Sequence, residues 1–171
     1  MKRGTTIYLY ELAWILPSVA IPVGMLVALL VTSFGAGKHL PGVGGMVDPN
    51  KLDTSPPFDR PGVVETSPGH YEIDMVSQVW SFSPNEIHLP AGADVTFVAT
   101  SRDVIHGLFI PKTLTNVMLL PGQIARVHAR FDQPGVYPFY CHEYCGILHH
   151  TMSGRIIVES GGAASPPKGG Q

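Results

Sequence analysis

The distribution of hydrophobic residues divides the chain into a long apolar segment and a region of short alternating segments. From Leu12 to Gly37 the sequence contains no Asp, Glu, Lys or Arg. As an α-helix this segment would be about 39 Å long, enough to cross a hydrocarbon core of about 30 Å. A cleaved signal peptide has a shorter apolar region, of about 7–15 residues. We therefore expect residues 1–37 to form an N-terminal transmembrane anchor.

The region 69–159 has the pattern of an all-β domain. Hydrophobic residues alternate with polar ones, for example at Val95, Phe97 and Ala99, and turn signals such as Pro121-Gly122 separate the segments. About seven or eight short strands at this spacing are typical of a Greek-key sandwich or barrel. The pattern predicts one compact β-domain.

Two further segments are rich in glycine and proline. Residues 38–68 lack a sustained hydrophobic period, which predicts an extended linker or an extended segment that lies along the surface of the domain. Residues 160–171, with the sequence SGGAASPPKGGQ, are typical of a flexible tail. The expected organisation is therefore anchor, linker, β-domain and tail.

The composition narrows the function classes. The formal net charge is −2 and charged residues make up only 14% of the chain, so the sequence lacks the basic surface of a nucleic-acid-binding protein. Two cysteines are too few for a disulfide framework. Eight histidines and six methionines keep metal binding open.

The candidate chemistry lies in one loop between the last two expected strands. Cys145, His149 and Met152 have the spacing Cys-x3-His-x2-Met, and His106 is the natural upstream histidine. Two imidazoles, a thiolate and a weak thioether are the ligands of a blue-copper site. Because Cys141 is then left over, the two thiolates can instead bridge two copper ions, each with one histidine. Met152 would be a weak ligand of one ion, and a backbone carbonyl in the loop a ligand of the other.

Other interpretations of the two cysteines remain open. A disulfide between Cys141 and Cys145 would close a short loop and add little stability. Zinc accepts two cysteines and two histidines but does not use a thioether. A catalytic cysteine needs a free thiolate beside a histidine. The spacing favours a dinuclear copper site over a mononuclear copper or zinc site and over a disulfide.

These residues carry a specific family resemblance. The motif Cys-x-Glu-x-Cys-x3-His-x2-Met, with the upstream Asp-Val-Ile-His, resembles the CuA signature of subunit II of the haem–copper oxygen reductases, the cytochrome c oxidases. The resemblance covers nearly the whole chain and implies a cupredoxin-like fold. It implies that both cysteines bridge the coppers, and it assigns these remaining ligands: His106 and Met152 to one copper, His149 and the main-chain oxygen of Glu143 to the other. The single expected span resembles the small B-family (ba-type) oxidases.

The resemblance also implies a function. Cytochrome c or a small copper protein would deliver electrons to the CuA centre, from which they would pass to haem in subunit I for oxygen reduction coupled to proton translocation. The chain would be the electron-entry subunit of the enzyme and hold no oxygen-reducing site. The implied location is a prokaryotic plasma membrane, with a cytoplasmic N-terminus and an extracytoplasmic copper domain. A CuA subunit of a nitric oxide reductase and a free-standing membrane-anchored copper carrier are the alternatives.

Three more residues receive roles from the resemblance. Trp80 is expected near the point of electron entry, with a place in the core as the alternative. The Glu143 side chain resembles a carboxylate that meets magnesium at the subunit I interface of larger oxidases. Glu11 matches a glutamate at the cytoplasmic mouth of a proton channel. The remaining conspicuous residues have no predicted ligand role: His142 and His150 adjoin ligands, His39, His70, His88 and His128 lack companions at metal spacing, and Met75 and Met118 are expected in the core.

Overall fold

The computed structural model describes residues 3–35 and 42–160. The chain divides into two units, residues 1–39 and 40–171. Each unit is described separately below.

The first unit is one apolar helix. Helix α1 spans Arg3–Leu30 and continues as a π-helical turn, η1, over Val31–Gly35. Pro17 and Pro22 lie inside α1. The stretch Gly4–Phe34 has a mean hydropathy of 2.3 and is unburied, so by length and composition it can cross a membrane.

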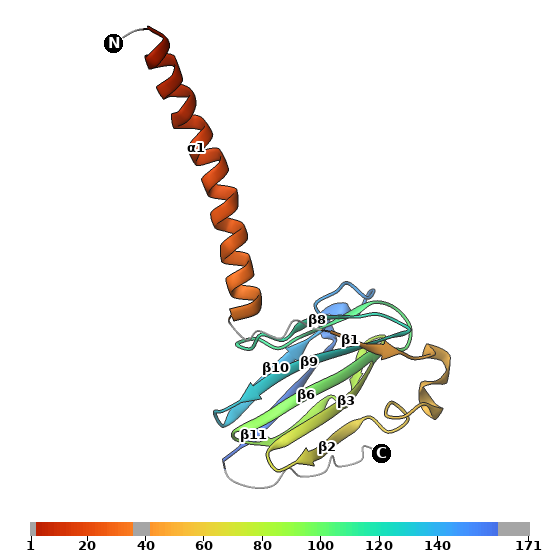
Figure 1. The fold of residues 1–171 in the computed structure, drawn as a ribbon. Coiled ribbons are helices and arrows are strands. Elements are labelled where there is room, and N and C mark those ends of the chain that lie inside the picture. Colours follow the sequence, from red (N-terminus) through yellow and green to blue (C-terminus); the bar gives the residue numbers. More distant parts are fainter. Residues whose placement is uncertain (1–2, 36–41, 161–171) are drawn as a thin grey trace. The chain divides into compact units, whose positions relative to one another are not determined.

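The second unit is a sandwich of two β-sheets (Figure 1). Its strands are β1 (Gly42–Met46), β2 (Gly62–Ser67), β3 (His70–Gln78), β4 (Ser81–Ser83), β5 (Glu86–Pro90), β6 (Ala93–Ser101), β7 (His106–Phe109), β8 (Asn116–Leu119), β9 (Gln123–Phe131), β10 (Gly135–Tyr140) and β11 (Ser153–Glu159). One sheet has the order β1-β9-β6-β3-β2, with β4 paired to β3, and the other has the order β5-β11-β10-β7-β8. The prediction of an all-β sandwich with one N-terminal helix is confirmed.

The strand pairing has the mixed character of a Greek-key sandwich. β3 pairs in parallel with β6, and β5 pairs in parallel with β11. The chain reaches each parallel partner only by a crossover connection, because a tight hairpin joins antiparallel strands. The crossovers bring β7 and the β10–β11 loop together, since β10 pairs with both β7 and β11.

The described part of the segment predicted as a linker belongs to the folded domain. β1 pairs with β9, and β2 pairs with β3. Between these strands, the short 3-10 helix η2 (Pro49–Thr54) leads into a turn, and Leu52 and Phe58 are buried against Val76 and Val98. The predicted boundary at residue 69 is therefore too late. The described domain has eleven strands, nine of them in the region 69–159, where seven or eight were expected. These strands were not predicted because glycine and proline interrupt the alternation of hydrophobic residues.

Three of the predicted segments extend outside the described residues. Residues 1–2 and 36–37 of the predicted anchor, residues 38–41 of the predicted linker and the predicted tail beyond Ser160 are not described.

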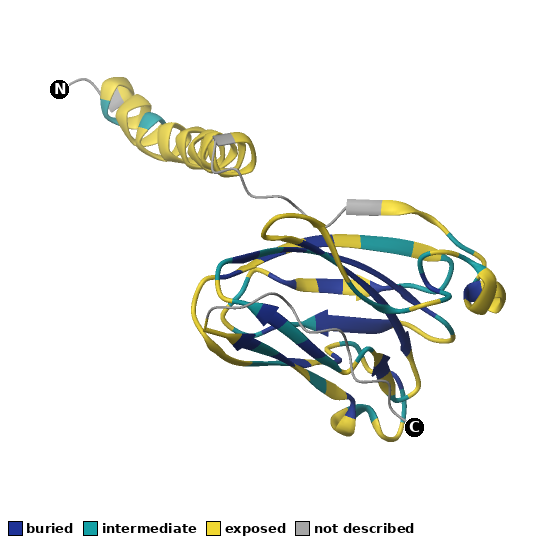
Figure 2. Cartoon of the chain, turned by 90° about the horizontal axis from the view of Figure 1, so that it is seen from below, coloured by how far each residue is buried: buried dark blue, intermediate teal, exposed yellow. Residues whose placement is uncertain are grey.

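The main core lies between the two sheets. In Figure 2 the buried positions follow the strands. The side chains of Met75, Phe97, Phe139 and Ile156 are fully buried. Met75 is thus in the core as predicted. Met118 is not: it is 46% exposed, because burial alternates along β8 and Met118 is on the outer face.

One charged side chain is buried on the opposite face of β3. Asp74 is only 4% exposed, its Oδ1 has no hydrogen-bond partner, and it lies on the same face as Val76, the face that Leu52 and Phe58 cover. Burial, and then the charge of Glu72, raise the pKa of Asp74 to about 6, from 3.8. The ionised form of Asp74 therefore destabilises the folded domain.

We expect Asp74→Asn to stabilise the protein above pH 6 and not below pH 4. A carboxyl whose pKa is raised in the folded state stabilises the fold fully below its unfolded pKa, and this contribution is lost as the pH rises through the folded pKa. The difference between variant and wild type at pH 8 should reach no more than about 3 kcal/mol. Denaturant unfolding of the full chain in detergent at pH 4, 6 and 8 measures it. Asp132→Asn, at an exposed carboxylate paired with Arg130, is the control. An equal effect of Asp74→Asn at pH 4 and pH 8 would show that the charge is not the cause.

Candidate metal centre

The sandwich brings two segments of the chain together at the candidate site. His106 is the first residue of β7, and the other candidate ligands lie in the loop that joins β10 to β11. The Cys141 N–H donates to the Met152 carbonyl at 3.0 Å, which closes the loop. The His142 N–H donates to the Gly107 carbonyl at 3.3 Å, which attaches the loop to β7.

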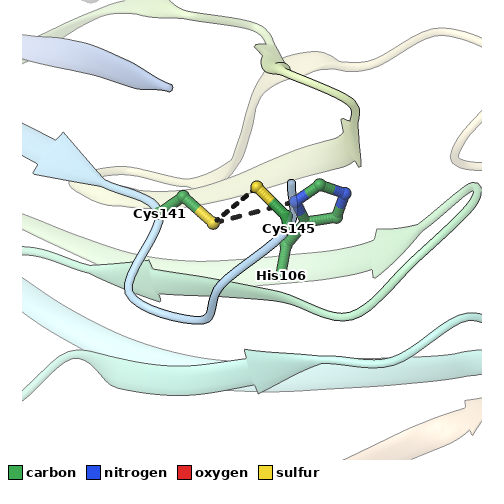
Figure 3. Close-up of side chains that lie close together, drawn as sticks. All are labelled: His106, Cys141 and Cys145. Atoms are coloured by element: carbon green, nitrogen blue, oxygen red, sulfur yellow. Dashed lines mark hydrogen bonds between the residues drawn. The ribbon is translucent and has the colours of Figure 1, made fainter. Parts of the chain in front are cut away.

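The two cysteine sulfurs lie at the centre of the cluster. Cys141 Sγ is 3.7 Å from Cys145 Sγ, and both thiols are free; a disulfide bond is about 2.05 Å long. Figure 3 shows both sulfurs and the His106 ring pointing toward one another, with His106 Nδ1 3.7 Å from Cys141 Sγ. On the other side, Cys145 Sγ is 3.4 Å from His149 Nδ1 and 3.7 Å from Met152 Sδ.

A backbone carbonyl completes the set of donor atoms. The Glu143 carbonyl oxygen is 3.2 Å from Cys141 Sγ. Among the described residues, the ligand atoms of His106, Cys141 and Cys145 form a group that lies within 4.8 Å of one another. The structure thus assembles all six atoms that the resemblance implied, each within contact distance of one of the sulfurs.

Four of the six candidate ligand residues are buried, and His149 and Glu143 are half-buried. His106 is 0% exposed, Met152 2%, and the two cysteines 7% or less. Burial, and then the neighbouring Cys141 thiol, raise the pKa of the Cys145 thiol to about 11. Two adjacent buried thiolates therefore require a cation between them, and binding a metal releases their protons.

The chemistry of these donors fits copper. Thiolate, thioether and imidazole together select copper, whereas zinc and the hard cations make no use of the Met152 sulfur. A thioether next to Cys145 therefore argues against zinc. Catalytic zinc sites keep one coordination position open for water or substrate. The donor atoms of this cluster do not require such a position.

The structure places the other predicted residues as follows. The Trp80 indole lies against Gly146, directly after Cys145: a Cβ on that glycine would come 3.1 Å from Trp80 Nε1. Trp80 is half-buried and packs on the main core, so it contacts both the β10–β11 loop and the core. Glu11 is exposed on α1, and the half-buried Glu143 side chain lies close to the β7 backbone at Gly107.

The two histidines without a predicted role lie outside the sulfur cluster. His142 is exposed, and its ring is 5.0 Å from the Phe109 ring. His150 is also exposed, within the short 3-10 helix η3 (His149–Thr151).

Sequence reasoning missed the role of Asp103. Its Oδ1 accepts a hydrogen bond from His106 Nε2 at 2.9 Å, so it holds the Nε2 edge of the ring while Nδ1 lies toward Cys141. The signal in the sequence is the carboxylate three residues before the histidine, in the motif Asp-Val-Ile-His.

Exposed hydrophobic side chains surround the candidate ligands along the chain. We call this set the apolar rim; its members are Val104, Ile105, Tyr144, Ile147 and Leu148. Tyr144 is 80% exposed and Ile147 78%, although both lie in the same loop as the buried cysteines. Large apolar side chains left in water next to a functional site are typical of surfaces that bind other proteins.

The comparisons with known proteins decide the family. Residues 75–161 match the family model described as cytochrome c oxidase subunit II, periplasmic domain. Over 165 residues the chain is 34% identical to cytochrome c oxidase subunit 2 of Thermus thermophilus, covering 92% of this chain and 96% of the relative. This chain belongs to the cytochrome c oxidase subunit II family.

Two more similarities describe how far the likeness extends. A chain from a cryo-EM structure of a haem–copper terminal oxidase dimer superposes with a TM-score of 0.74 at 30% identity, covering 88% of this chain and 99% of that one. The nitrous-oxide reductase of Cupriavidus necator is 38% identical over 92 residues, which is 52% of this chain but only 14% of the reductase. About nine-tenths of this chain is thus similar to oxidase subunits, and about half of it is similar to the reductase.

Family membership gives the coarse assignments directly. This subunit II is part of a haem–copper oxidase, an oxidoreductase complex, which implies a partner subunit I. Its β-sandwich is a copper-binding, cupredoxin-like domain of the electron-transfer type, and its apolar helix is the candidate membrane anchor.

Proposed function

We propose that the chain is the electron-entry subunit of a cytochrome c oxidase and holds a dinuclear CuA centre. Cys141 and Cys145 would supply thiolates to both coppers. The remaining ligands are assigned as follows: His106 and Met152 on one copper, His149 and the carbonyl oxygen of Glu143 on the other. The observation that supports this most is that every one of these donor atoms lies within 3.7 Å of a cysteine sulfur.

The protein contributes rigidity and a dry environment. When bound, the copper pair supplies a one-electron redox couple in which each electron is shared between two ions. The bond from the Cys141 N–H to the Met152 carbonyl and the pairing of β10 with β11 keep the loop in one geometry. Fixed ligands in a buried site change little between the oxidised and the reduced form, which lowers the reorganisation energy of electron transfer.

Electron delivery is assigned to the apolar rim and Trp80. The donor, cytochrome c or a small copper protein, docks on the exposed side chains of the rim. Trp80 carries the electron inward because its ring touches Gly146, next to the bridging Cys145. The electron then passes to haem in subunit I for oxygen reduction coupled to proton translocation.

The membrane arrangement is part of the same proposal. The N-terminus lies in the cytoplasm of a prokaryote and the copper domain on the extracytoplasmic side of its plasma membrane. Glu11, near the N-terminal end of α1, then lies at the cytoplasmic edge, where it serves proton entry. A magnesium ion at the Glu143 carboxylate stays a prediction for the interface with subunit I.

Electron delivery to the haem of the intact complex tests the proposal. Stopped-flow reduction by a reduced donor should show the copper signal changing before the haem signal. Because the rim is apolar, the second-order rate should vary by no more than about threefold when the ionic strength rises tenfold. Ile147→Glu should slow the reaction about tenfold, and Val64→Glu, at an exposed position of β2, should not.

Two results would contradict the proposal. Copper that is reduced without any later reduction of haem would make the chain a carrier and not an entry subunit. A steep fall of the rate with salt, together with a silent Ile147→Glu, would remove the apolar docking surface.

A further inference from the structure

The carboxylate of Asp103 is held in place by three hydrogen bonds. Oδ1 accepts from His106 Nε2 at 2.9 Å and from the Val104 N–H at 2.7 Å. Oδ2 accepts from the Val79 N–H at 2.8 Å. The Asp103 side chain is 29% exposed, and the His106 side chain is fully buried.

One oxygen of this carboxylate determines how His106 faces the cysteines. A carboxylate only accepts hydrogen bonds, so the proton of the neutral His106 ring is on Nε2. The lone pair of Nδ1 is then directed to the side where Cys141 Sγ lies, 3.7 Å away. A fixed tautomer and a fixed ring orientation are what a carboxylate behind a metal-binding histidine provides.

The other oxygen holds the turn that carries Trp80. Val79 precedes Trp80 directly, and its N–H is the donor to Oδ2. Trp80 in turn lies against Gly146, the neighbour of Cys145. The Asp103 side chain therefore contacts both His106 of β7 and the turn that places Trp80 against Gly146.

The neighbouring arginine does not neutralise this carboxylate by a direct bond. Arg102 is engaged by Asp53 in a two-pronged pair, with Nη1 3.0 Å and Nη2 2.7 Å from the two carboxylate oxygens. Asp103 keeps its oxygens for His106, Val104 and Val79. The negative charge of Asp103 thus acts on the ring of His106.

We propose that Asp103 is a positioning residue of the copper centre, which orients His106 toward Cys141 with one oxygen and fixes the Trp80 turn against the copper loop with the other. This inference rests on the proposed function for the role of His106. A negative charge behind the imidazole makes it a stronger donor, and this favours the oxidised copper pair. Removal of the charge should therefore raise the reduction potential.

The test compares Asp103→Asn and Asp103→Ala with Asp132→Asn in the full chain in detergent. Asp132→Asn removes a carboxylate charge that is paired with Arg130 but no bond to His106, so it is the control. Both Asp103 variants should bind copper about tenfold more weakly. They should also shift the reduction potential upward and change the hyperfine coupling of a histidine nitrogen in the electron paramagnetic resonance spectrum. Asp132→Asn should leave all three unchanged.

A copper-independent measurement separates this proposal from the proposed function. Nitrogen NMR of the metal-free chain, at a pH where the ring is neutral, should show His106 as the pure Nε2–H tautomer in the wild type and as a mixture in Asp103→Ala. If Asp103→Ala does not fold, Asp103→Asn carries the test, because it keeps an accepting oxygen and loses only the charge and the acceptor for Val79. Wild-type copper content other than two atoms overturns the proposed function. Unchanged potential, affinity and tautomer in the Asp103 variants, or an equal shift in Asp132→Asn, overturns the positioning role.

Discussion

Replacing Cys145 by serine should reduce the copper content of the full chain from two atoms to at most one. Cys145 Sγ contacts Cys141 Sγ, His149 Nδ1 and Met152 Sδ, so it joins both halves of the cluster. A serine hydroxyl is a hard, poor bridging ligand for copper, and one remaining thiolate cannot hold two ions of the same kind. Electron transfer from the donor to haem should then fall to background, and elemental analysis with a reduction assay measures both effects.

His150→Gln is the matched control for this variant. His150 lies in the same loop and is exposed, and its substitution leaves the sulfur cluster intact. It should keep two coppers and the wild-type rate. If Cys145→Ser retained two equivalent coppers, Cys145 would not be a bridging ligand.

The second large effect is expected for Gly154→Ala. Gly154 is in β11, opposite Phe139 of β10. A Cβ on Gly154 would come within 3.0 Å of the Phe139 ring and of the Asn85 carbonyl oxygen, closer than real Cβ atoms approach. The Phe139 ring is fully buried and the Asn85 atom belongs to the backbone, so neither group can move away easily. We expect a loss of about 3 kcal/mol or more and a fall of the melting temperature of about 10 °C.

Gly62→Ala tests whether this effect comes from crowding and not from glycine replacement in a strand. In β2 the nearest heavy atom to a Cβ on Gly62 is the Arg60 carbonyl oxygen at 3.8 Å, an ordinary contact. Thermal unfolding should show little change for Gly62→Ala. A Gly154→Ala protein as stable as the wild type would mean that β10 and β11 pack less tightly than the structure has them.

The candidate ligands in the β10–β11 loop were predictable because they are close to one another in the sequence. Cys141, Cys145, His149 and Met152 follow one another within a single loop, so their spacing records the geometry of the site almost directly. His106 comes from a distant strand, and its place was predicted only because it ends a recognisable motif. The geometry then shows what the spacing leaves open: the thiols are free and the thioether touches Cys145.

Features that depend on distant partners were not predictable. β1 is a glycine-rich segment that becomes a strand because β9 offers it hydrogen bonds, about eighty residues away. Leu52 and Phe58 have no periodic pattern, yet they cover the outer face of β3 and β6. The role of Asp103 depends on Val79, which only the folded turn brings within 2.8 Å.

The copper count and electron paramagnetic resonance spectrum of the oxidised, fully loaded wild-type chain test the central claim most directly. Two coppers per chain, with one unpaired electron coupled equally to two copper nuclei, are expected from the pair of sulfurs 3.7 Å apart. One copper with a single-nucleus spectrum, or zinc in its place, would contradict the dinuclear centre and with it the proposed role in electron entry.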